Sequence, residues 1–220
     1  MKCDLCPRKC LVDRKKGEKG ICGQTENLKV ARAALHFWEE PCISGDAGSG
    51  AVFFSGCPLH CVFCQNENIA NGTVGKEISL ERLVDIFLEL QEKRANNINL
   101  VTPGHFVPQI VKALDQARKE GLTLPVVYNT SSYETVDTIK MLEGYVDIYL
   151  PDFKYMSPVL SKKYSHAPDY AEVAKAAIAE MVRQTGKAVF VNGDEDNLIL
   201  SGTIVRHLTL PGCMADSMQI

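Results

Sequence analysis

Three cysteines in one short loop are the residues of this chain best suited to chemistry. The loop reads Cys57-Pro-Leu-His-Cys61-Val-Phe-Cys64, with three and then two residues between the cysteines, and it follows the apolar run 51–54. Cysteine thiolates are the usual ligands of iron–sulfur clusters, and a cubane normally takes four of them. Three thiolates at this spacing therefore predict a cluster with one iron left without a protein ligand, where a substrate can bind.

Other roles fit this loop less well. A structural zinc site closes its shell with four donors, and the nearest further donor, His60, would point away from a cluster that the loop wraps. Buried core cysteines are common singly, but three within eight residues, beside Pro and His, favour ligation.

A second group of cysteines lies at the N-terminus, and two, three and eleven residues separate its members: Cys3, Cys6, Cys10 and Cys22. The segment has too little apolar material to fold on a core of its own, so a metal bound by four thiolates would supply the missing stability. Zinc and a second 4Fe-4S cluster both accept four sulfurs, and we favour the cluster because the chain already carries one. A flexible basic tail with reactive thiols is the alternative.

Composition indicates one soluble domain with a sizeable core and a short appendage. The 220 residues are 45% hydrophobic and 23% charged. No apolar run approaches the roughly 18 residues of a membrane span, and the N-terminus has no signal-type segment, so we expect a cytoplasmic protein. A reducing compartment would not keep disulfides, which again favours metal ligation for the nine cysteines.

Charge is distributed unevenly along the chain. The net charge is −3, yet the first 32 residues hold nine Lys or Arg against four Asp or Glu. This basic segment lacks interleaved aromatic residues, so we interpret it as a solvated face and do not expect nucleic acid as a partner.

Short apolar runs alternate with helical patterns from Ala51 onward. The predicted strands are 51–54, 98–102, 124–128, 145–150, 188–191 and 203–210. The predicted helices begin at the Ser79 cap and cover 80–88, 110–117, 136–142 and 170–181. This alternation predicts an α/β domain over 51–220, with parallel strands and right-handed crossovers, preceded by a Cys-rich extension and connector over 1–50. The helical pattern after Pro211-Gly212 stops at Ile220, so we expect an incomplete last helix.

The cysteine loop resembles the signature of the radical S-adenosylmethionine (SAM) superfamily, C-x3-C-x-aromatic-C, with Phe63 in the aromatic position. The stretch Trp38-Glu-Glu-Pro-Cys-Ile-Ser-Gly45, the glycines at 48 and 50, and Phe53-Phe-Ser-Gly-Cys57 are similar to pyruvate formate-lyase activating enzyme homologues. The resemblance implies a partial (β/α)6 barrel and a 4Fe-4S cluster on Cys57, Cys61 and Cys64.

The same resemblance implies an activity and partners. SAM would bind the open iron and be cleaved reductively to methionine and a 5'-deoxyadenosyl radical, which abstracts hydrogen from a substrate. The implied partners are SAM, an electron donor such as flavodoxin or ferredoxin, and a protein substrate such as a glycyl-radical enzyme.

Polar residues follow the predicted strands, at the edge where parallel α/β barrels build their sites. The resemblance assigns Phe63 to the adenine, and it assigns Asn129, Asp152 and Lys154 to the ribose and carboxylate. Arg206 and His207 match the position near the methionyl group. The turn Thr102-Pro-Gly-His105 lacks the glutamate that many members use for the SAM amine, which leaves the backbone of Thr102 and Pro103, and the side chain of His105. We assign no catalytic residue beyond the cluster.

Alternatives remain at the level of function and of single residues. A radical SAM enzyme could instead modify a peptide or a small molecule. A non-catalytic iron–sulfur or zinc protein, such as an electron carrier, would normally use four cysteines and would need no SAM site. His105 and His207 could be structural, and Asp152 with Lys154 could be a surface ion pair of little energetic worth.

Overall fold

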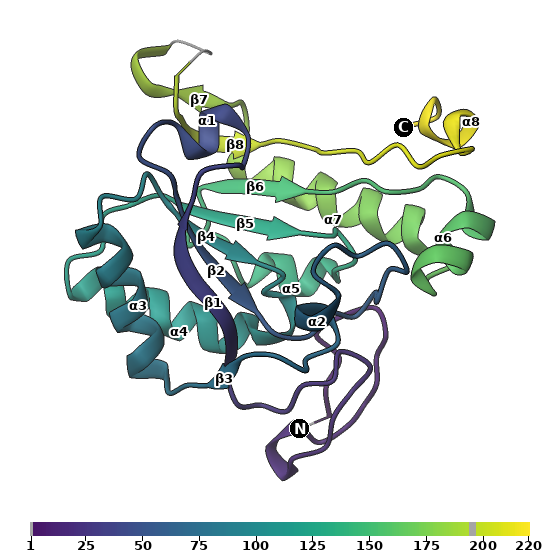
Figure 1. The fold of residues 1–220 in the computed structure, drawn as a ribbon, viewed down its shortest axis with the longest axis horizontal. Coiled ribbons are helices and arrows are strands. Elements are labelled where there is room, and N and C mark those ends of the chain that lie inside the picture. The colour runs from purple at the N-terminus through teal and green to yellow at the C-terminus, as the bar shows by residue number, and fades with distance from the viewer. Residues whose placement is uncertain (1, 194–196) are drawn as a thin grey trace.

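Eight strands form one twisted sheet in residues 2–193 and 197–220, the part of the chain that this computed structural model describes (Figure 1). Their order across the sheet is β3-β1-β2-β4-β5-β6-β8-β7. The strands are β1 (Lys29–His36), β2 (Ser49–Phe54), β3 (Lys76–Glu77), β4 (Ile98–Val101), β5 (Val126–Thr130), β6 (Ile148–Pro151), β7 (Val189–Phe190) and β8 (Ile199–Thr203).

The centre of the sheet is parallel, as the alternating pattern predicts. Strands β2, β4, β5, β6 and β8 pair in parallel, each with its neighbour in the sheet order. Residues of β5 are buried throughout, which is typical of parallel strands covered on both faces. The carboxyl ends of these strands therefore lie along one edge of the sheet.

The N-terminal flank of the sheet differs from the prediction. Strand β1 pairs antiparallel with β2, and β3 pairs antiparallel with β1, although the stretch before Ala51 was expected to be a connector. The β1 sequence, Lys29-Val-Ala-Arg-Ala-Ala-Leu-His36, lacks strict alternation and is only partly buried, so its pairing is set by its neighbour rather than by its own pattern.

The C-terminal flank also corrects the prediction. The stretch 188–191 is not a parallel strand, because β7 covers only two residues and pairs antiparallel with β8. The eight residues between β7 and β8 are too few for the helical crossover that a parallel pair needs. The predicted strand 203–210 is displaced toward the N-terminus: β8 begins at Ile199, which is buried against β5 and β6, and beyond Thr203 the chain keeps an isolated bridge between Arg206 and Asp152.

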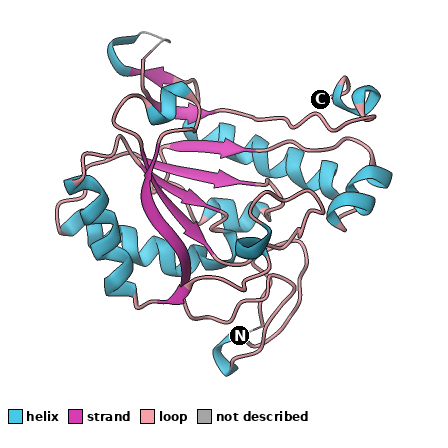
Figure 2. Ribbon diagram, viewed as in Figure 1, coloured by secondary structure: helices cyan, strands magenta, loops and turns pink. Residues whose placement is uncertain are grey.

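Helices α3, α4, α5 and α7 pack on one face of the sheet and share its main apolar core (Figure 2). Ser79 and Thr135 cap α3 and α5, since their side chains accept the backbone N–H groups of Arg82 and Thr138. The helices are α1 (Pro41–Ser44), α2 (Glu67–Ala70), α3 (Leu80–Glu92), α4 (Val107–Lys119), α5 (Val136–Lys140), α6 (Pro158–Ser165), α7 (Tyr170–Thr185) and α8 (Met214–Ser217), with 3-10 turns η1 (Arg14–Lys16), η2 (Gly104–Phe106) and η3 (Val191–Gly193).

The opposite face of the sheet carries a smaller core. Val127 of β5 and Ile148 of β6 pack there with Ile43 of α1 and Ile199 of β8. Successive side chains of a strand point to opposite faces, so the fully buried β5 and β6 contribute to both cores. No helix in the described part of the chain is long and apolar enough to span a bilayer.

Candidate functional site

The cysteine loop begins directly beyond the carboxyl end of β2 and is held by hydrogen bonds to its sulfurs. The N–H of Leu59 donates to Sγ of Cys57 at 3.5 Å, and Oγ of Ser165 donates to Sγ of Cys61 at 2.9 Å. Burial raises the pKa of Cys57 to about 11 and also raises the pKa of Cys61. Free thiols here would stay protonated, but a metal deprotonates its thiol ligands outright, and these donors then stabilise the thiolates.

His60 points away from the cysteines, as expected. Its Nδ1 lies 3.0 Å from Oδ1 of Asn71, and its Nε2 lies 2.8 Å from the carbonyl oxygen of Ile21. Both ring nitrogens are therefore engaged by segments outside the loop.

Aromatic side chains pack against the cysteine loop. Phe63 packs edge-on against Tyr155 and Tyr164, each with ring centroids 6.4 Å apart. Leu59 is fully buried in the same cluster, which also contains Tyr170. This packing fixes the loop against α6 and α7 and leaves Phe63 partly exposed.

Charged and polar side chains gather at the carboxyl ends of β5, β6 and β8, together with two from the segment between β1 and α1. We call this group the rim cluster: Glu39, Glu40, Asn129, Asp152, Lys154 and Arg206. The Arg206 guanidinium donates to Oδ1 of Asp152 at 3.0 Å and to Oδ1 of Asn129 at 2.6 Å. Nζ of Lys154 donates to the other Asp152 oxygen at 2.6 Å. Four residues that the sequence analysis selected from separate segments are thus joined in one network.

Glu39 and Glu40 join this cluster from the segment after β1, and sequence reasoning did not select them. Arg206 donates to Oε2 of Glu39 at 3.3 Å and lies 3.7 Å from Glu40. Burial raises the pKa of Glu39, while the Arg206 charge opposes that shift. The available signal was a pair of carboxylates directly after an apolar stretch, but that stretch was not recognised as a strand.

The turn after β4 brings a neutral histidine close to the loop. Thr102 has a positive φ of 55°, and its N–H donates to the carbonyl of Asn129 at 2.9 Å. Nε2 of His105 donates to the carbonyl of Ser55 at 2.7 Å, and burial lowers the pKa of His105 to about 3. Its Nδ1 is then a buried acceptor, and it has no partner in the described structure.

His207 has structural contacts on both ring nitrogens. Nδ1 donates to the carbonyl of Phe153 at 2.7 Å, and Nε2 lies 2.8 Å from Oγ of Ser217 in α8. The structure thus ties His207 to the C-terminal segment, whereas its neighbour Arg206 faces the rim cluster.

Glu134 is a further residue that sequence reasoning missed. It is buried, and it accepts hydrogen bonds from the hydroxyls of Thr130 at 2.8 Å and Tyr128 at 3.3 Å. Its carboxyl lies against the turn after β4, since a Cβ added to Gly104 would be 2.4 Å from Oε2. Burial raises the pKa of Glu134 to about 7. Its only sequence signal was its position two residues beyond the polar stretch after β5.

The N-terminal cysteines lie within electrostatic range of one another. Burial raises the pKa of Cys6 and of Cys22. Charge interactions with Cys10 and Cys22 raise the pKa of Cys6 further, and those with Cys3 and Cys10 raise the pKa of Cys22. In residues 2–193 and 197–220, no three Cys, His, Asp or Glu side chains approach closely enough to share a single metal ion.

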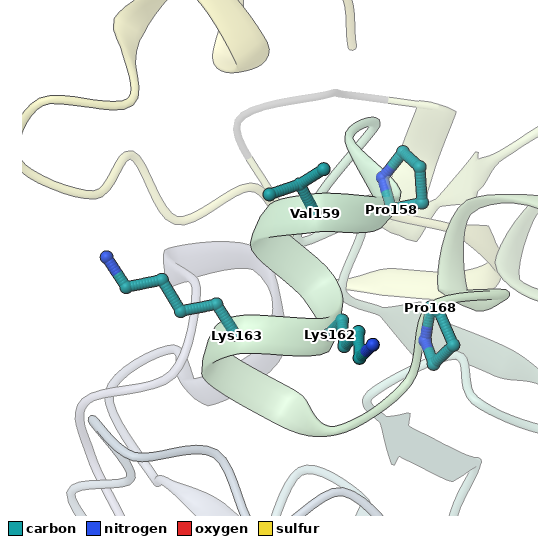
Figure 3. Close-up of a pocket in the computed structure, with 5 residues that line it drawn as sticks. All are labelled: Pro158, Val159, Lys162, Lys163 and Pro168. Carbon is teal, nitrogen blue, oxygen red and sulfur yellow. The ribbon is translucent and has the colours of Figure 1, made fainter.

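Surface depressions elsewhere contain none of these residues. One lies on α6 and is lined by Pro158, Val159, Lys162, Lys163 and Pro168 (Figure 3). Another lies at the amino ends of β5 and β6, beside Arg118 and Asp147. Neither borders the cysteine loop or the rim cluster.

Comparison with known proteins identifies the family. The sequence model of the Radical SAM superfamily matches residues 51–196. The chain is also 28% identical over 215 residues to an uncharacterized protein of Methanocaldococcus jannaschii; the match covers 95% of this chain but 57% of that relative. The region that the family model matches contains the cysteine loop, most of β2, and the parallel strands β4, β5 and β6. The chain therefore belongs to the radical SAM superfamily.

Proposed function

We propose that this protein is an activating-type radical SAM enzyme that binds a 4Fe-4S cluster on Cys57, Cys61 and Cys64 and abstracts hydrogen from a protein substrate. The observation that carries the proposal is the shared edge: the cysteine loop follows β2, and the rim cluster lies beyond β5, β6 and β8 at the same ends of parallel strands. Superfamily membership supplies the reaction class.

We also propose that the sheet is the wall of a partial barrel. Strands β1 and β8 are five strand spacings apart in the sheet order, which would be about 24 Å across a flat sheet. The side chain of Glu39, three residues after β1, nevertheless reaches 3.3 Å from Arg206, three residues after β8. The segment that carries Glu39 leaves β1 beside the amino end of β2 and crosses the face of the sheet to α1, whose Ile43 packs on Val127 and Ile148, and a sheet curled around this face would enclose the contact.

The residues present fit the implied cofactors. The Cys57 and Cys61 sulfurs already accept an amide and a hydroxyl donor, which a thiolate bound to iron would keep. Oε2 of Glu40, within the rim cluster, has no hydrogen-bond partner in the described structure, and neither do the buried Nδ1 of His105 after β4 and Oγ of Ser132 after β5. Buried polar groups normally have partners, so a polar ligand at this edge accounts for them.

When bound, the reduced cluster and SAM supply the radical chemistry, and the protein supplies binding and orientation. Arg206 and Lys154 present the positive charges that a carboxylate requires. Asn129 and Asp152 present an amide and a carboxylate that suit ribose hydroxyls. Phe63, partly exposed beside Cys64, offers an apolar surface for a nucleobase.

Glu134 supplies the carboxylate that the turn Thr102-Pro-Gly-His105 lacks. The family's usual glutamate would extend from this turn, whereas here a carboxyl from the next loop packs against Gly104. Burial raises the pKa of Glu134 to about 7 although the Thr130 and Tyr128 hydroxyls oppose the shift, and an ammonium group brought near this carboxyl would further favour its ionised form. We infer that Glu134, together with Nδ1 of His105, accepts hydrogen bonds from the SAM amine.

Reductive SAM cleavage tests the proposal directly. Anaerobic protein reduced with dithionite should convert SAM to methionine and 5'-deoxyadenosine. Cys61→Ala should abolish this conversion, whereas Cys42→Ala, a cysteine of α1 outside both groups, should retain it. Wild-type protein that holds iron and sulfide but never produces 5'-deoxyadenosine would support a non-catalytic iron–sulfur protein instead.

The protein substrate rests on the resemblance of the 38–57 stretch to activating-enzyme homologues. Deuterium labelling identifies the hydrogen donor, because abstraction transfers the label into 5'-deoxyadenosine. Transfer of deuterium from a glycine of a partner protein would support the activating role. Transfer from a peptide or a small molecule would instead support the alternative, a radical SAM enzyme that modifies such a substrate.

A further inference from the structure

The four N-terminal cysteines are gathered by the fold of residues 2–26. Cys3 exchanges backbone hydrogen bonds with the returning chain, since its N–H donates to the Val12 carbonyl and its carbonyl accepts from Leu11, both at 2.9 Å. Gly17, with a positive φ of 81°, ends η1 and lets the chain turn back. Gly20 then packs on Cys10, where an added Cβ would lie 3.0 Å from the sulfur.

Backbone N–H groups are directed at the sulfurs of this group. Ile21 donates to Sγ of Cys10 at 3.3 Å, and the backbone N–H groups of Arg8 and Gln24 oppose the rise that burial causes in the pKa of Cys6 and Cys22. Two of these donors lie two residues after their cysteine, as Leu59 does after Cys57 in the other group. Amide donors stabilise thiolates, so both groups share a backbone arrangement suited to metal-bound sulfur.

We propose that Cys3, Cys6, Cys10 and Cys22 bind an iron–sulfur cluster of their own, which holds the N-terminal segment against the cysteine loop 57–64, here called the SAM-cluster loop. Zinc would draw four sulfurs to about 2.3 Å from one ion. A cubane cluster uses the same four sulfurs, and the superfamily signature at Cys57, Cys61 and Cys64 favours it here, because this chain would already be supplied with iron and sulfide.

Charge also favours a multi-thiolate centre in this segment. The first 32 residues carry nine basic and four acidic side chains, although the whole chain is net negative. Buried Arg14 lies within this lobe and reduces the pKa increase of Cys22. Positive charge offsets the negative charge that four thiolates bring to a cluster.

Arg8, between Cys6 and Cys10 in the sequence, links the two cysteine groups. Its guanidinium donates to the carbonyls of Pro58 at 2.9 Å and Ser165 at 3.0 Å, and it also contacts the His166 carbonyl. Pro58 follows Cys57, and the hydroxyl of Ser165 donates to Cys61. Cluster binding at the N-terminus would therefore immobilise the Arg8 side chain, which contacts Pro58 in the SAM-cluster loop and the end of α6 that donates to Cys61.

A second link runs through Cys22 itself. Its carbonyl packs on Gly56, where an added Cβ would lie 2.4 Å from the oxygen, and the preceding Ile21 carbonyl pairs with His60. Gly56, directly before the SAM-cluster loop, and His60, within it, thus contact the backbone at Cys22 and at the preceding residue. The proposed centre stabilises that loop through these contacts.

Metal analysis of the full chain tests the proposal without relying on SAM cleavage. We would purify proteins anaerobically from iron-replete cells and measure iron, acid-labile sulfide and zinc per chain. Wild type should hold about eight irons, and a Cys57/Cys61/Cys64 triple Ala variant should keep about four irons with matching sulfide. Cys42→Ala is the matched control and should equal wild type.

The reverse variant tests the link to the SAM-cluster loop. Replacing Cys3, Cys6, Cys10 and Cys22 by Ala should leave about four irons, and a chelator should remove them several-fold faster than from the corresponding wild-type cluster. One zinc or no metal in the triple variant would contradict the proposed N-terminal cluster. An unchanged rate of iron release from the four-cysteine variant would contradict the stabilising link to the SAM-cluster loop. If the reverse variant does not fold, the folded triple variant and an Arg8→Ala release rate decide both points.

Discussion

At the scale of single residues, Arg206 is the side chain on which the rim cluster depends. It contacts Asp152, Asn129 and Glu39, which come from three different segments. Its guanidinium is already paired with carboxylates, so a SAM carboxylate would join an existing network. Loss of Arg206 would leave partly buried carboxylates without their main counter-ion, which is more costly than loss of an exposed ion pair.

Arg206→Ala should therefore weaken SAM binding by about 1 to 3 kcal/mol, because a charged hydrogen bond is lost. Iron content should stay at the wild-type value, since no cysteine contacts this residue in the hydrogen bonds described. Equilibrium titration with SAM measures the effect. Arg82→Ala is the control: it removes an exposed ion pair with Glu89 on α3 and should leave SAM affinity unchanged, and equal affinities for both variants would return Arg206 to a structural role.

Glu134 leads to a prediction about pH. Burial raises its folded-state pKa from 4.5 to about 7, so the protonated form predominates in the folded protein between these values while the unfolded chain is ionised. The stability that the protonated group contributes is thus present below pH 4.5 and is lost as pH rises through 7. A tenfold change in an acid dissociation constant corresponds to about 1.4 kcal/mol, so the contribution of this carboxyl is at most about 3 kcal/mol.

Glu134→Gln imitates the protonated carboxyl at every pH. Its free energy of unfolding relative to wild type should therefore rise between about pH 5 and pH 8, by up to about 3 kcal/mol. Denaturant titrations of both proteins at the two pH values measure this difference. A difference that does not change with pH would show that Glu134 titrates normally.

At the scale of elements, the contact between the N-terminal segment and the SAM-cluster loop depends on Gly56. Its φ is +91°, a region that favours glycine, and the Cys22 carbonyl occupies the space where a Cβ would lie. Gly121 provides the comparison, since its φ is +105° with no atom within 4 Å of the added Cβ.

Gly56→Ala should consequently destabilise the protein more than Gly121→Ala. Both substitutions incur backbone strain of about 1 to 2 kcal/mol, and overpacking adds about 1 to 3 kcal/mol at Gly56 alone. Chemical denaturation gives the two values, and protease digestion should release the N-terminal segment more readily from Gly56→Ala. Equal destabilisation would mean that the segment adapts without loss of packing.

At the scale of the whole molecule, stability is concentrated in the parallel centre of the sheet. Strands β4 and β5 have neighbours on both sides, and their apolar side chains include fully buried core residues such as Leu100, Val127 and Tyr128. The β7–β8 hairpin lies at an edge, with Val189 half exposed. Opening the edge exposes little apolar surface, whereas opening the centre exposes the core.

Hydrogen exchange should reflect this difference. Amides of β4 and β5 should exchange only through global unfolding, whereas those of β7 and α8 should exchange through local opening. Mass spectrometry of peptides from each element, followed over increasing denaturant, measures the opening free energies. Exchange of β5 before β7 would contradict this distribution of stability.

The sequence by itself determined the cysteine loop, the α/β class and several element boundaries, because these depend on local pattern. Spacing alone predicts Cys57, Cys61 and Cys64 as cluster ligands, and apolar periodicity with a capping Ser79 predicts α3, which the structure contains. The choice of Asn129, Asp152 and Lys154 rested on their position after predicted strands, that of Arg206 on its place in the last predicted strand, and all four on resemblance; the structure joins them in one network.

Only the tertiary structure decided how distant segments meet. The pairing of β1 with β2 and the antiparallel β7 arise from neighbouring strands rather than from their own sequences, so local pattern could not predict them. Glu39 reaches Arg206 across 167 positions, and Glu134 reaches Gly104 from the next loop. A glutamate that becomes buried, such as Glu134, looks the same in the local sequence as a glutamate on an exposed loop. Its burial and its hydrogen-bond partners depend on how the sheet brings distant loops together.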